Sequence, residues 1–237
     1  MTNLLYASEI PIDEELVVRI PTVGQVLDSN GLYDNIVSTI TATPRDLMVE
    51  LDDLGINYSE IEEYDLFLML FQSLKNIDTS LLFGGVDFSK YEISITDTSE
   101  VVLQNQETGN YIDKFKYFYL CDLMCKINYI KRNNKKAAND AARSYLIEKE
   151  RKKKKRAKRK KKDDENPLNG LIISLVNTAE FKYDYSSVLD LTIYQFNASL
   201  HQVIDRVNFD KLMIGVYAGT VDTSKMSPKA LNWIKSD

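Results

Sequence analysis

The sequence RSYLIEKERKKKKRAKRKKK, residues 143–162, is the stretch around which the rest of the chain is organised. It holds thirteen Lys and Arg and only two carboxylates, Glu148 and Glu150, so its formal charge is +11. The whole chain of 237 residues carries −5, which leaves −16 for the remainder. Residues 1–100 supply nearly all of this, with nineteen Asp and Glu against four Lys and Arg. An acidic front half therefore joins a mixed-charge tail through a strongly basic segment.

The basic segment is predicted to be helical. Residues 137–162 consist mostly of Ala, Arg, Leu, Glu and Lys, which are strong helix formers. Beyond Arg151 the like charges repel, so we expect the helix to fray there unless a partner neutralises it. The segment 163–167, three acidic residues followed by Asn166 and Pro167, indicates a linker. The candidates for electrostatic contact are the cations Arg151, Lys152, Lys153, Lys154, Lys155, Arg156, Lys158, Arg159, Lys160, Lys161 and Lys162.

Three uses of this segment are open: a surface facing solvent or the acidic half, contact with nucleic acid, and contact with lipid headgroups. The segment has no Asn or Gln to read base edges. It also has no aromatic residue after Tyr145 on which single-stranded bases could stack. We therefore interpret it as an electrostatic element, a hinge and clamp toward the acidic front half, with nucleic-acid binding as an alternative function.

The front half is predicted to be an acidic helical domain, residues 1–76, with an N-terminal arm. The arm contains one expected strand, Leu16 to Ile20. A helix over 44–54 is expected to begin at the Thr43 cap and to bury Leu54. A second helix is expected after a capping box formed by Ser59 and Glu62.

Alternating apolar residues replace the helical period between residues 78 and 112. The segments 91–95, 101–105 and 110–112 predict a two- or three-stranded antiparallel meander. Asp113 is a predicted cap for a strongly apolar helix. We expect that helix to be buried on several sides or to lie in a subunit interface. Residues 77–132 thus form the predicted second unit, and residues 133–166 form a basic helix and linker.

Residues 167–237 are predicted to form a helical C-terminal domain. The expected helices cover 168–176, 193–207 with Thr192 as cap, and 209–217, followed by a turn over 228–234. Aromatic residues concentrate here, and many partly polar rings suit protein–protein surfaces as well as a core. The fold class is therefore mainly helical α+β. The candidates for protein binding are Tyr183, Tyr185, Tyr194, Phe196, Tyr217 and Trp233.

No residue pattern predicts catalysis, a cofactor or a metal site. Cys121 and Cys125 lie four apart on one helical face, without the further ligands that a tetrahedral site needs. His201 is the only histidine and stands near no nucleophile motif. Gly84 and Gly85 lack a following Lys and Ser/Thr, so they indicate a turn or a close-packing point. We therefore expect a non-enzymatic protein. Because no signal peptide and no membrane-spanning apolar run is recognised, we also expect it in the cytoplasm and without a membrane partner.

The chain resembles proteins encoded in the tail-morphogenesis region of phages and prophages of Gram-positive bacteria. The resemblance covers most of the chain and consists of family fingerprints rather than chemical motifs. Its segments are IPTVGQVL (20–27), TATPRDLMVELDDLGINYSEI (41–61), YDLFLMLF (64–71), DTSLLFGGVDFSKYE (78–92), YLIEKERKKKKRAKRKKK (145–162), LIISLVNTAEFKYDYSSVLDLTIYQFNASLHQVI (171–204) and KLMIGVYAGTVD (211–222).

This resemblance implies a role in tail assembly through protein–protein binding. One form of that role is a chaperone that holds the tape-measure protein in the cytoplasm of the bacterial host. The other is a baseplate or hub component that stays in the virion tail. The implied partners are the tape-measure, tube or baseplate proteins, and a homo-oligomer is also open. The resemblance implies no catalytic residue.

Overall fold

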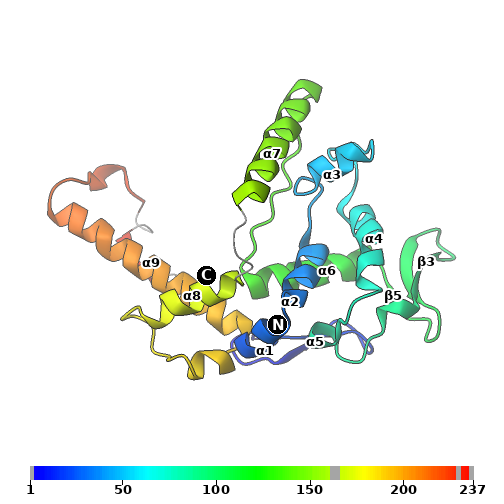
Figure 1. Cartoon of the computed structure of the whole chain (residues 1–237), viewed down its shortest axis with the longest axis horizontal. Helices are drawn as coiled ribbons and strands as arrows, with labels where there is room; N and C mark the ends of the chain where they lie inside the picture. The colour runs from blue at the N-terminus through cyan, green and yellow to red at the C-terminus, as the bar shows by residue number, and fades with distance from the viewer. Residues whose placement is uncertain (1–2, 161–165, 228–230, 235–237) are drawn as a thin grey trace.

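The computed structural model describes residues 3–160, 166–227 and 231–234, and it confirms the mainly helical α+β class. Figure 1 shows a central body from which two helices project, α7 (Asp140–Lys160) and α9 (Ile193–Tyr217). Within the described ranges, no helix has the length and apolar character needed to cross a bilayer. The body, built from the elements before α7, determines where the two projecting helices begin.

The N-terminal arm is a short hairpin joined to the C-terminal third. Strand β1 (Glu9–Pro11) pairs antiparallel with β2 (Val17–Arg19), which confirms the strand expected within 16–20. Helix α1 (Val23–Asp28) begins beside the start of α9. Ile193 donates its backbone N–H to Pro21 and Val23 donates to Leu191, each at 2.8 Å. Two segments about 170 residues apart in the sequence are therefore held side by side by backbone hydrogen bonds.

One hydrophobic core fills the body. Helices α2 (Leu32–Thr41), α4 (Glu63–Leu74) and α6 (Lys114–Asn128) surround it, and the short α5 (Ser80–Phe83) closes one side. The rings of Phe67 and Tyr117 stack with centroids 4.4 Å apart. Buried residues from Ala7 to Phe196 belong to this core, so the segments 1–76, 77–132 and 167–237 all contribute to it. Their boundaries as domains stay a prediction.

The predicted β-meander is confirmed. Strands β3 (Tyr91–Ile95), β4 (Val101–Asn105) and β5 (Tyr111–Ile112) form an antiparallel sheet in the order β3–β4–β5. Leu103 and its cross-strand partner Ile112 are buried in the core, so the small sheet covers this face against the body, as it must to be stable in water. The Asp113 cap is also confirmed, since its side chain accepts a hydrogen bond from the backbone N–H of Lys116 at 2.7 Å.

Two helix starts predicted in the front half are wrong. Helix α3 spans Met48–Asp53, because residues 44–47 form turns in which Asp46 donates to the Thr43 carbonyl. Leu54, expected to be buried, is 67% exposed beyond the helix end. Helix α4 has Glu62 as its N-cap residue without a side-chain bond, so the Ser59–Glu62 capping box does not form. Asn57 organises that turn instead, because it accepts a hydrogen bond from the Ser59 N–H.

The C-terminal helices correct a third expectation. Helix α8 (Pro167–Val176) matches the helix predicted over 168–176. The two helices predicted over 193–207 and 209–217 are instead one helix, α9. An ion pair from Arg206 to Asp210, 3.0 Å long, spans the expected break, where neither Gly nor Pro interrupts the chain. Of the turn predicted over 228–234, residues 228–230 lie outside the described ranges.

Removing the Thr192 cap is expected to destabilise the fold by about 1 kcal/mol, the usual cost of losing a side-chain N-cap. The Thr192 hydroxyl accepts from the Gln195 N–H at 3.2 Å, and the Gln195 side chain accepts from the Thr192 N–H at 2.9 Å. Urea denaturation of Thr192→Ala measures the loss. Thr192→Ser keeps the hydroxyl and serves as the control. Equal stability of the Ala variant and the natural protein would contradict the role of the cap.

Candidate functional site

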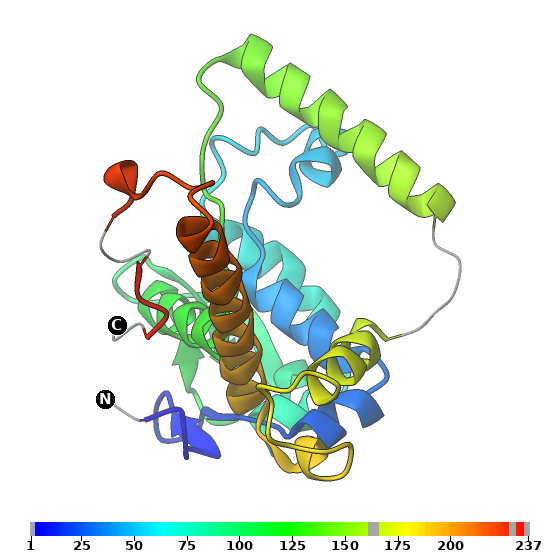
Figure 2. The ribbon, with the colours of Figure 1, turned by 90° about the vertical axis from the view of Figure 1, so that its left-hand side faces the viewer.

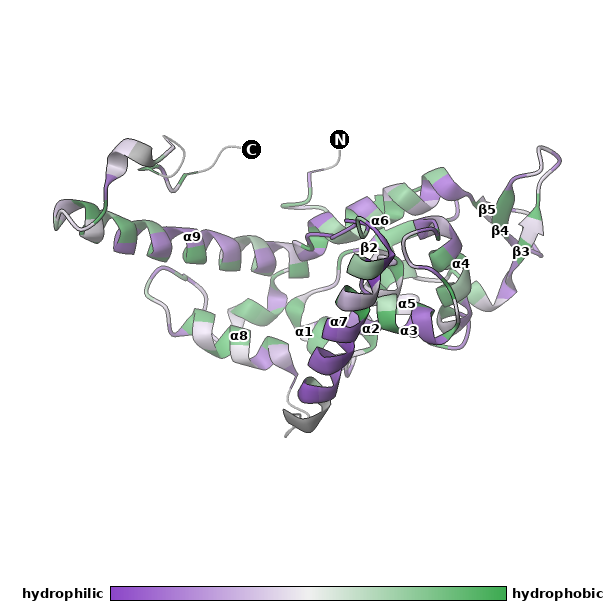
Figure 3. Cartoon of the chain, turned by 90° about the horizontal axis from the view of Figure 1, so that it is seen from above, coloured by the Kyte–Doolittle hydropathy of each residue, from purple (hydrophilic) through white to green (hydrophobic). Residues whose placement is uncertain are grey.

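Helix α7 carries most of the predicted basic site and stands away from the body (Figures 1 and 2). It lies beside α3, and Figure 3 shows it as strongly hydrophilic. The helix is expected to fray after Arg151 unless a partner neutralises its charge. Within the described residues α7 continues to Lys160, and α3 of the same chain brings three carboxylates to it.

The contact between α7 and α3 has an apolar centre. Ile147 is 7% exposed and packs into a cluster with Met48, Val49, Leu51 and residues of the turn and helix that follow α3. This cluster is separate from the core of the body. Burying a side chain of this size contributes about 1.5–3 kcal/mol, so the apolar contact is a substantial part of what holds α7 in place.

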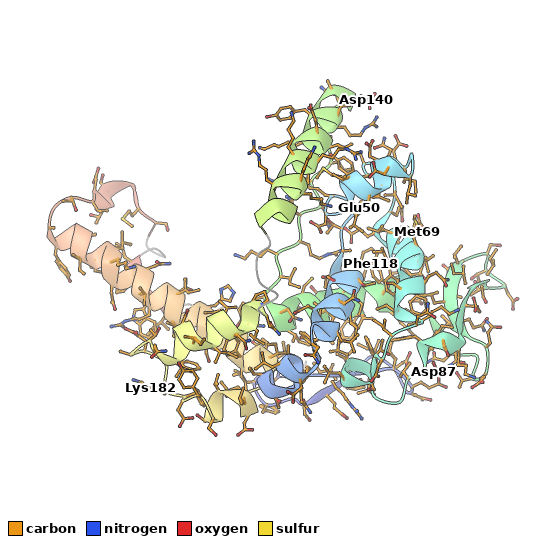
Figure 4. The ribbon with its side chains drawn as sticks, viewed as in Figure 1. Glu50, Met69, Asp87, Phe118, Asp140 and Lys182 are labelled. Atoms are coloured by element: carbon orange, nitrogen blue, oxygen red, sulfur yellow. The ribbon has the colours of Figure 1, made fainter. Side chains whose placement is uncertain are left out.

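Ion pairs flank this apolar centre. The Arg151 guanidinium lies 2.7 Å from a carboxylate oxygen of Asp52 and 2.7 Å from one of Asp53. The Lys154 ammonium lies 2.6 Å from Glu50, which Figure 4 shows on α3 beside α7. Partial burial alone would raise the pKa of Glu50, but the hydrogen bond and charge of Lys154 lower it, so this carboxyl is ionised at neutral pH. The acidic front half thus supplies counter-charge to two of the predicted cations.

The remaining cations divide into four groups. Lys152 and Lys153 are exposed and pair within α7, with Glu148 at 2.7 Å and Glu150 at 3.2 Å. Lys155 and Arg156 are exposed, and no ion pair joins them to another described residue. Lys158, Arg159 and Lys160 lie in the last described turn of the helix. Lys161 and Lys162 lie outside the described residues.

The segment between α6 and α7 is tied to the body at Arg132. Its guanidinium lies 2.7 Å from Glu63, and both side chains are only 17% exposed. The same guanidinium donates to the Thr41 carbonyl at 3.1 Å. No local pattern predicts this contact between Arg132 and Glu63, because the two residues lie 69 positions apart and neither belongs to a motif. Together with Arg45, which donates to the Lys135 carbonyl at 2.5 Å, it fixes the base of the projecting helix.

The structure separates the six aromatic residues predicted to bind protein. Tyr183 and Tyr185 are exposed in the loop after α8, and Tyr217 at the end of α9 is 84% exposed. Phe196 is fully buried in the core, so its ring does not reach the surface of the chain. Two others are half-buried: Tyr194 lies beside Tyr129, and Trp233 lies under the Arg206 guanidinium at 4.7 Å.

Exposed aliphatic residues that were not predicted from the sequence lie in the same third of the chain. They lie on α8 and α9, the two helices of the C-terminal third, and they are Leu171, Ile173, Ile204 and Ile214, each between 42% and 69% exposed. Large exposed apolar side chains make this third of the chain a candidate for protein interaction. A helix whose apolar residues exceed what one buried face needs was the signal in the sequence.

The cysteines and the histidine lie apart from any possible catalytic or metal partner among the described residues. Cys121 and Cys125 are both buried and free, and their mutual hydrogen bond together with burial raises the pKa of Cys121. His201 is exposed and stacks on Tyr129 with ring centroids 4.5 Å apart. No group of three potential metal ligands occurs among the described residues. None of these positions brings a nucleophile and a base together.

Gly84 is a close-packing point. It has a φ of +60°, and a Cβ atom there would lie 3.0 Å from the Arg19 guanidinium. The Arg19 side chain pairs with Glu9 at 3.0 Å across the hairpin. A cavity of about 500 Å³ adjoins this turn. Its lining contains side chains of both charges, including Glu15, Arg19, Asp87 and Lys90. Glycine at position 84 therefore admits an arginine side chain that completes an ion pair.

The comparison with known families concerns the C-terminal third. Residues 158–236, about a third of the chain, match a family model described as YomV second domain. This family is associated with phages and prophages. No curated protein and no protein of known structure matches the chain. The matched region contains α8, α9 and the exposed apolar and aromatic residues described above.

We expect the apolar contact to outweigh the ion pairs in holding α7 against α3. Ile147→Ala should cost about 2 kcal/mol or more at this contact, because truncating a buried Ile loses transfer free energy and leaves a cavity. Hydrogen exchange of the α3 and α7 amides measures the loss of protection. The double variant Arg151→Gln with Lys154→Gln should have a smaller effect, because ion pairs between largely exposed groups contribute little.

Two comparisons complete this test. Tyr145→Ala removes a large α7 side chain that is 64% exposed, and it should leave exchange unchanged. At about 1 M salt, where the Debye length is about 3 Å, the natural protein and the double variant should exchange alike. If the double variant lost as much protection as Ile147→Ala, the clamp would be electrostatic instead.

Proposed function

We propose that this chain is a non-enzymatic phage tail protein that acts in tail assembly by binding other proteins, as a chaperone for the tape-measure protein. The observation that supports this function is the surface of α8 and α9, where large apolar and aromatic side chains are exposed within the region matching a phage-associated family. The resemblance of most of the chain to tail-morphogenesis proteins is the reason for proposing a tail role.

The exposed surface suits a chaperone that shields apolar segments. Ile173 on α8 and Tyr185 in the following loop are each 54% exposed. The two are adjacent, because Asn177 donates to the Ile173 carbonyl at 2.7 Å and to the Tyr185 hydroxyl at 3.0 Å. Aromatic rings that combine an apolar face with a polar edge are enriched where one protein binds another. This pair is therefore the proposed contact with an apolar segment of the client.

Co-expression of the full chain with the tape-measure protein encoded nearby tests the proposal. The two should copurify, and Ile173→Asp with Tyr185→Ser should weaken binding by about 30-fold, the effect of losing about 2 kcal/mol at an interface hot spot. Asn169→Asp adds the same charge at another exposed position of α8 and should leave binding unchanged. The proposal fails if the tape-measure protein does not associate, or if the control weakens binding equally.

A baseplate or hub role is the alternative within tail assembly. The two roles differ in where the protein ends up, because a chaperone leaves before the tail is complete and a baseplate component remains. Mass spectrometry of purified particles separates them: absence of the chain from mature virions agrees with the chaperone. A stoichiometric amount in the virion would replace the chaperone by the structural role.

Nucleic-acid binding through α7 is a second candidate, favoured by the exposed Lys155 and Arg156, which pair with no described carboxylate. Such binding would be dominated by phosphates, so the logarithm of affinity would fall with the logarithm of salt concentration. We expect the effect to be weak, because Arg151 and Lys154 are already paired with α3. Fluorescence titration of duplex DNA over a range of salt checks this. Strong binding that Lys155→Gln with Arg156→Gln abolishes would favour the nucleic-acid function.

A further inference from the structure

A cavity of about 210 Å³ lies where the connection from α6 to α7 meets the body. We call it the α7-base cavity. Its lining side chains come from the segments 44–45, 58–63, 114–118 and 134–136. Pockets that bury drug-sized ligands typically measure about 300–1,000 Å³, so this cavity suits a smaller molecule.

Tyr58 lines the α7-base cavity and carries an unsatisfied hydroxyl. The residue is 3% exposed, and its hydroxyl oxygen is buried without a hydrogen-bond partner among the described residues. Most buried polar groups in proteins have a partner, because a buried group without one loses its hydration and gains nothing in return. The hydroxyl therefore indicates an acceptor that enters the cavity from outside the chain.

The carboxylates of the lining already have partners. Glu62 pairs with Lys114, whose hydrogen bond and charge hold the pKa of Glu62 below its usual value. Glu63 pairs with Arg132 and accepts a hydrogen bond from Asn134. These contacts satisfy the two acidic side chains of the cavity with other groups of the chain.

Three cations of the lining have no ion pair with any described residue. They are Arg45, Lys135 and Lys136. Arg45 donates to the Lys135 carbonyl at 2.5 Å, and it keeps further N–H groups to donate, because a guanidinium carries five. With Lys114 included, four cations and two carboxylates line the cavity, so its net charge is +2.

The rest of the lining is apolar. It includes Pro44, Ile61 and Phe118, and Figure 4 labels Phe118 on α6. Phe118 is 37% exposed, so part of its ring is available for contact. Aromatic rings pack favourably against one another in offset or edge-to-face arrangements. The cavity thus offers an apolar surface and a cluster of donors to the same ligand.

We propose that the α7-base cavity binds an aryl phosphate, that is, one phosphate monoester on a single aromatic ring. A phosphate monoester carries about −1.5 to −2 charge at pH 7 and has three acceptor oxygens, which matches the net charge and the donors of the cavity. Arg45, Lys135 and Lys136 bind the phosphate, the Tyr58 hydroxyl donates to one of its oxygens, and the aromatic ring packs on Phe118. A carboxylate has a single charge and only two oxygens, so it matches this set of donors less well. The inference does not depend on the tail function.

Binding at this place would also fasten the base of α7. The ligand would contact the turn before α4 and the connection before α7 at the same time. Tyr58 also belongs to the apolar cluster that contains Ile147 of α7. A ligand that binds only this arrangement stabilises it by mass action. We therefore expect the aryl phosphate to slow hydrogen exchange in the segments 57–62 and 130–139.

Calorimetric titration of the full chain with phenyl phosphate tests the proposal. Phenyl phosphate should bind with a Kd of about 1 mM or tighter, as expected for a small ligand held by several polar contacts. Inorganic phosphate should bind more weakly because it lacks the ring, and phenol should not bind because it lacks the charge. The absence of saturable binding, or equal binding of phenol and phenyl phosphate, would overturn the proposal.

The Tyr58 hydroxyl is tested by Tyr58→Phe, which removes one oxygen atom. Binding of phenyl phosphate should weaken about tenfold, the effect of losing one hydrogen bond to a charged group. The Tm should not fall, because the hydroxyl has no partner to lose in the free protein. Tyr145→Phe removes the hydroxyl of an exposed tyrosine outside the cavity and should leave binding unchanged. Unchanged binding by Tyr58→Phe would contradict the role of Tyr58.

The cations are tested by Lys135→Gln with Lys136→Gln. This double variant removes two charges from the cavity and should weaken binding of phenyl phosphate about tenfold or more, because charged donors form the stronger hydrogen bonds. Lys155→Gln with Arg156→Gln removes the same charge from an exposed part of α7 outside the cavity and should leave binding unchanged. Equal weakening by both double variants would show that net charge, and not the cavity, controls the binding.

Hydrogen exchange of the natural protein with phenyl phosphate locates the site. Protection should rise in the segments 57–62 and 130–139, and protection confined to α7 after Arg151 would overturn the assignment. A short phosphotyrosine peptide carries the same aryl phosphate and distinguishes two sources of the ligand. If the peptide raises the same protection, the source is a phosphorylated protein side chain, and if it is excluded while phenyl phosphate binds, the source is a free small molecule.

Discussion

The exchange of backbone hydrogen bonds between the starts of α1 and α9 is the constraint on which the arrangement of this molecule depends. Pro21 and Leu191 each accept one bond from the other segment, and both helices begin with the same Thr-to-Gln capping box. Phe196, one turn later, is fully buried in the body. These contacts fix the direction of α9 from its first turn. Because a helix is stiff, the later turns then project wherever that direction leads, beyond the reach of the core.

The two projecting helices leave the body for opposite chemical reasons. Among the described side chains of α7 only Ile147 is buried, and the charged residues keep most of the others in water. Its contact with α3 consists of Ile147, the partly buried Leu146 and a few ion pairs. Helix α9 has more apolar surface than the body covers, and hydration of that surface remains unfavourable. The chain itself supplies apolar contact and counter-charge to α7, whereas it leaves apolar surface of α9 exposed. Binding of another protein through apolar contact is therefore expected at α9.

Local patterns in the sequence predicted the elements that local chemistry determines. The three strands of the meander and the caps at Asp113 and Thr192 are where alternation and cap residues place them. The predictions that are wrong concern positions where a distant contact or a competing turn determines the local structure. Thr43 caps a turn rather than a helix, and Asn57 takes the place expected for Ser59. The burial of Phe196 and the pairing of Arg132 with Glu63 depend on chain segments about 70 or more positions away, which no local pattern contains.

The basic segment shows how a conspicuous charge pattern and a binding surface can differ. Its charge predicted an electrostatic element, and the structure places Glu50, Asp52 and Asp53 against it. A cation already paired within the chain must lose that partner before it binds an outside anion. Its net contribution to binding is the free energy of the new ion pair minus that of the internal pair, and these two are similar. An exposed Ile or Tyr on α9 has no such competitor within the described chain, and its burial against another protein is favourable from the outset. The strongest charge in the sequence therefore organises the chain, while the less conspicuous apolar surface of the C-terminal third is better placed to bind a partner.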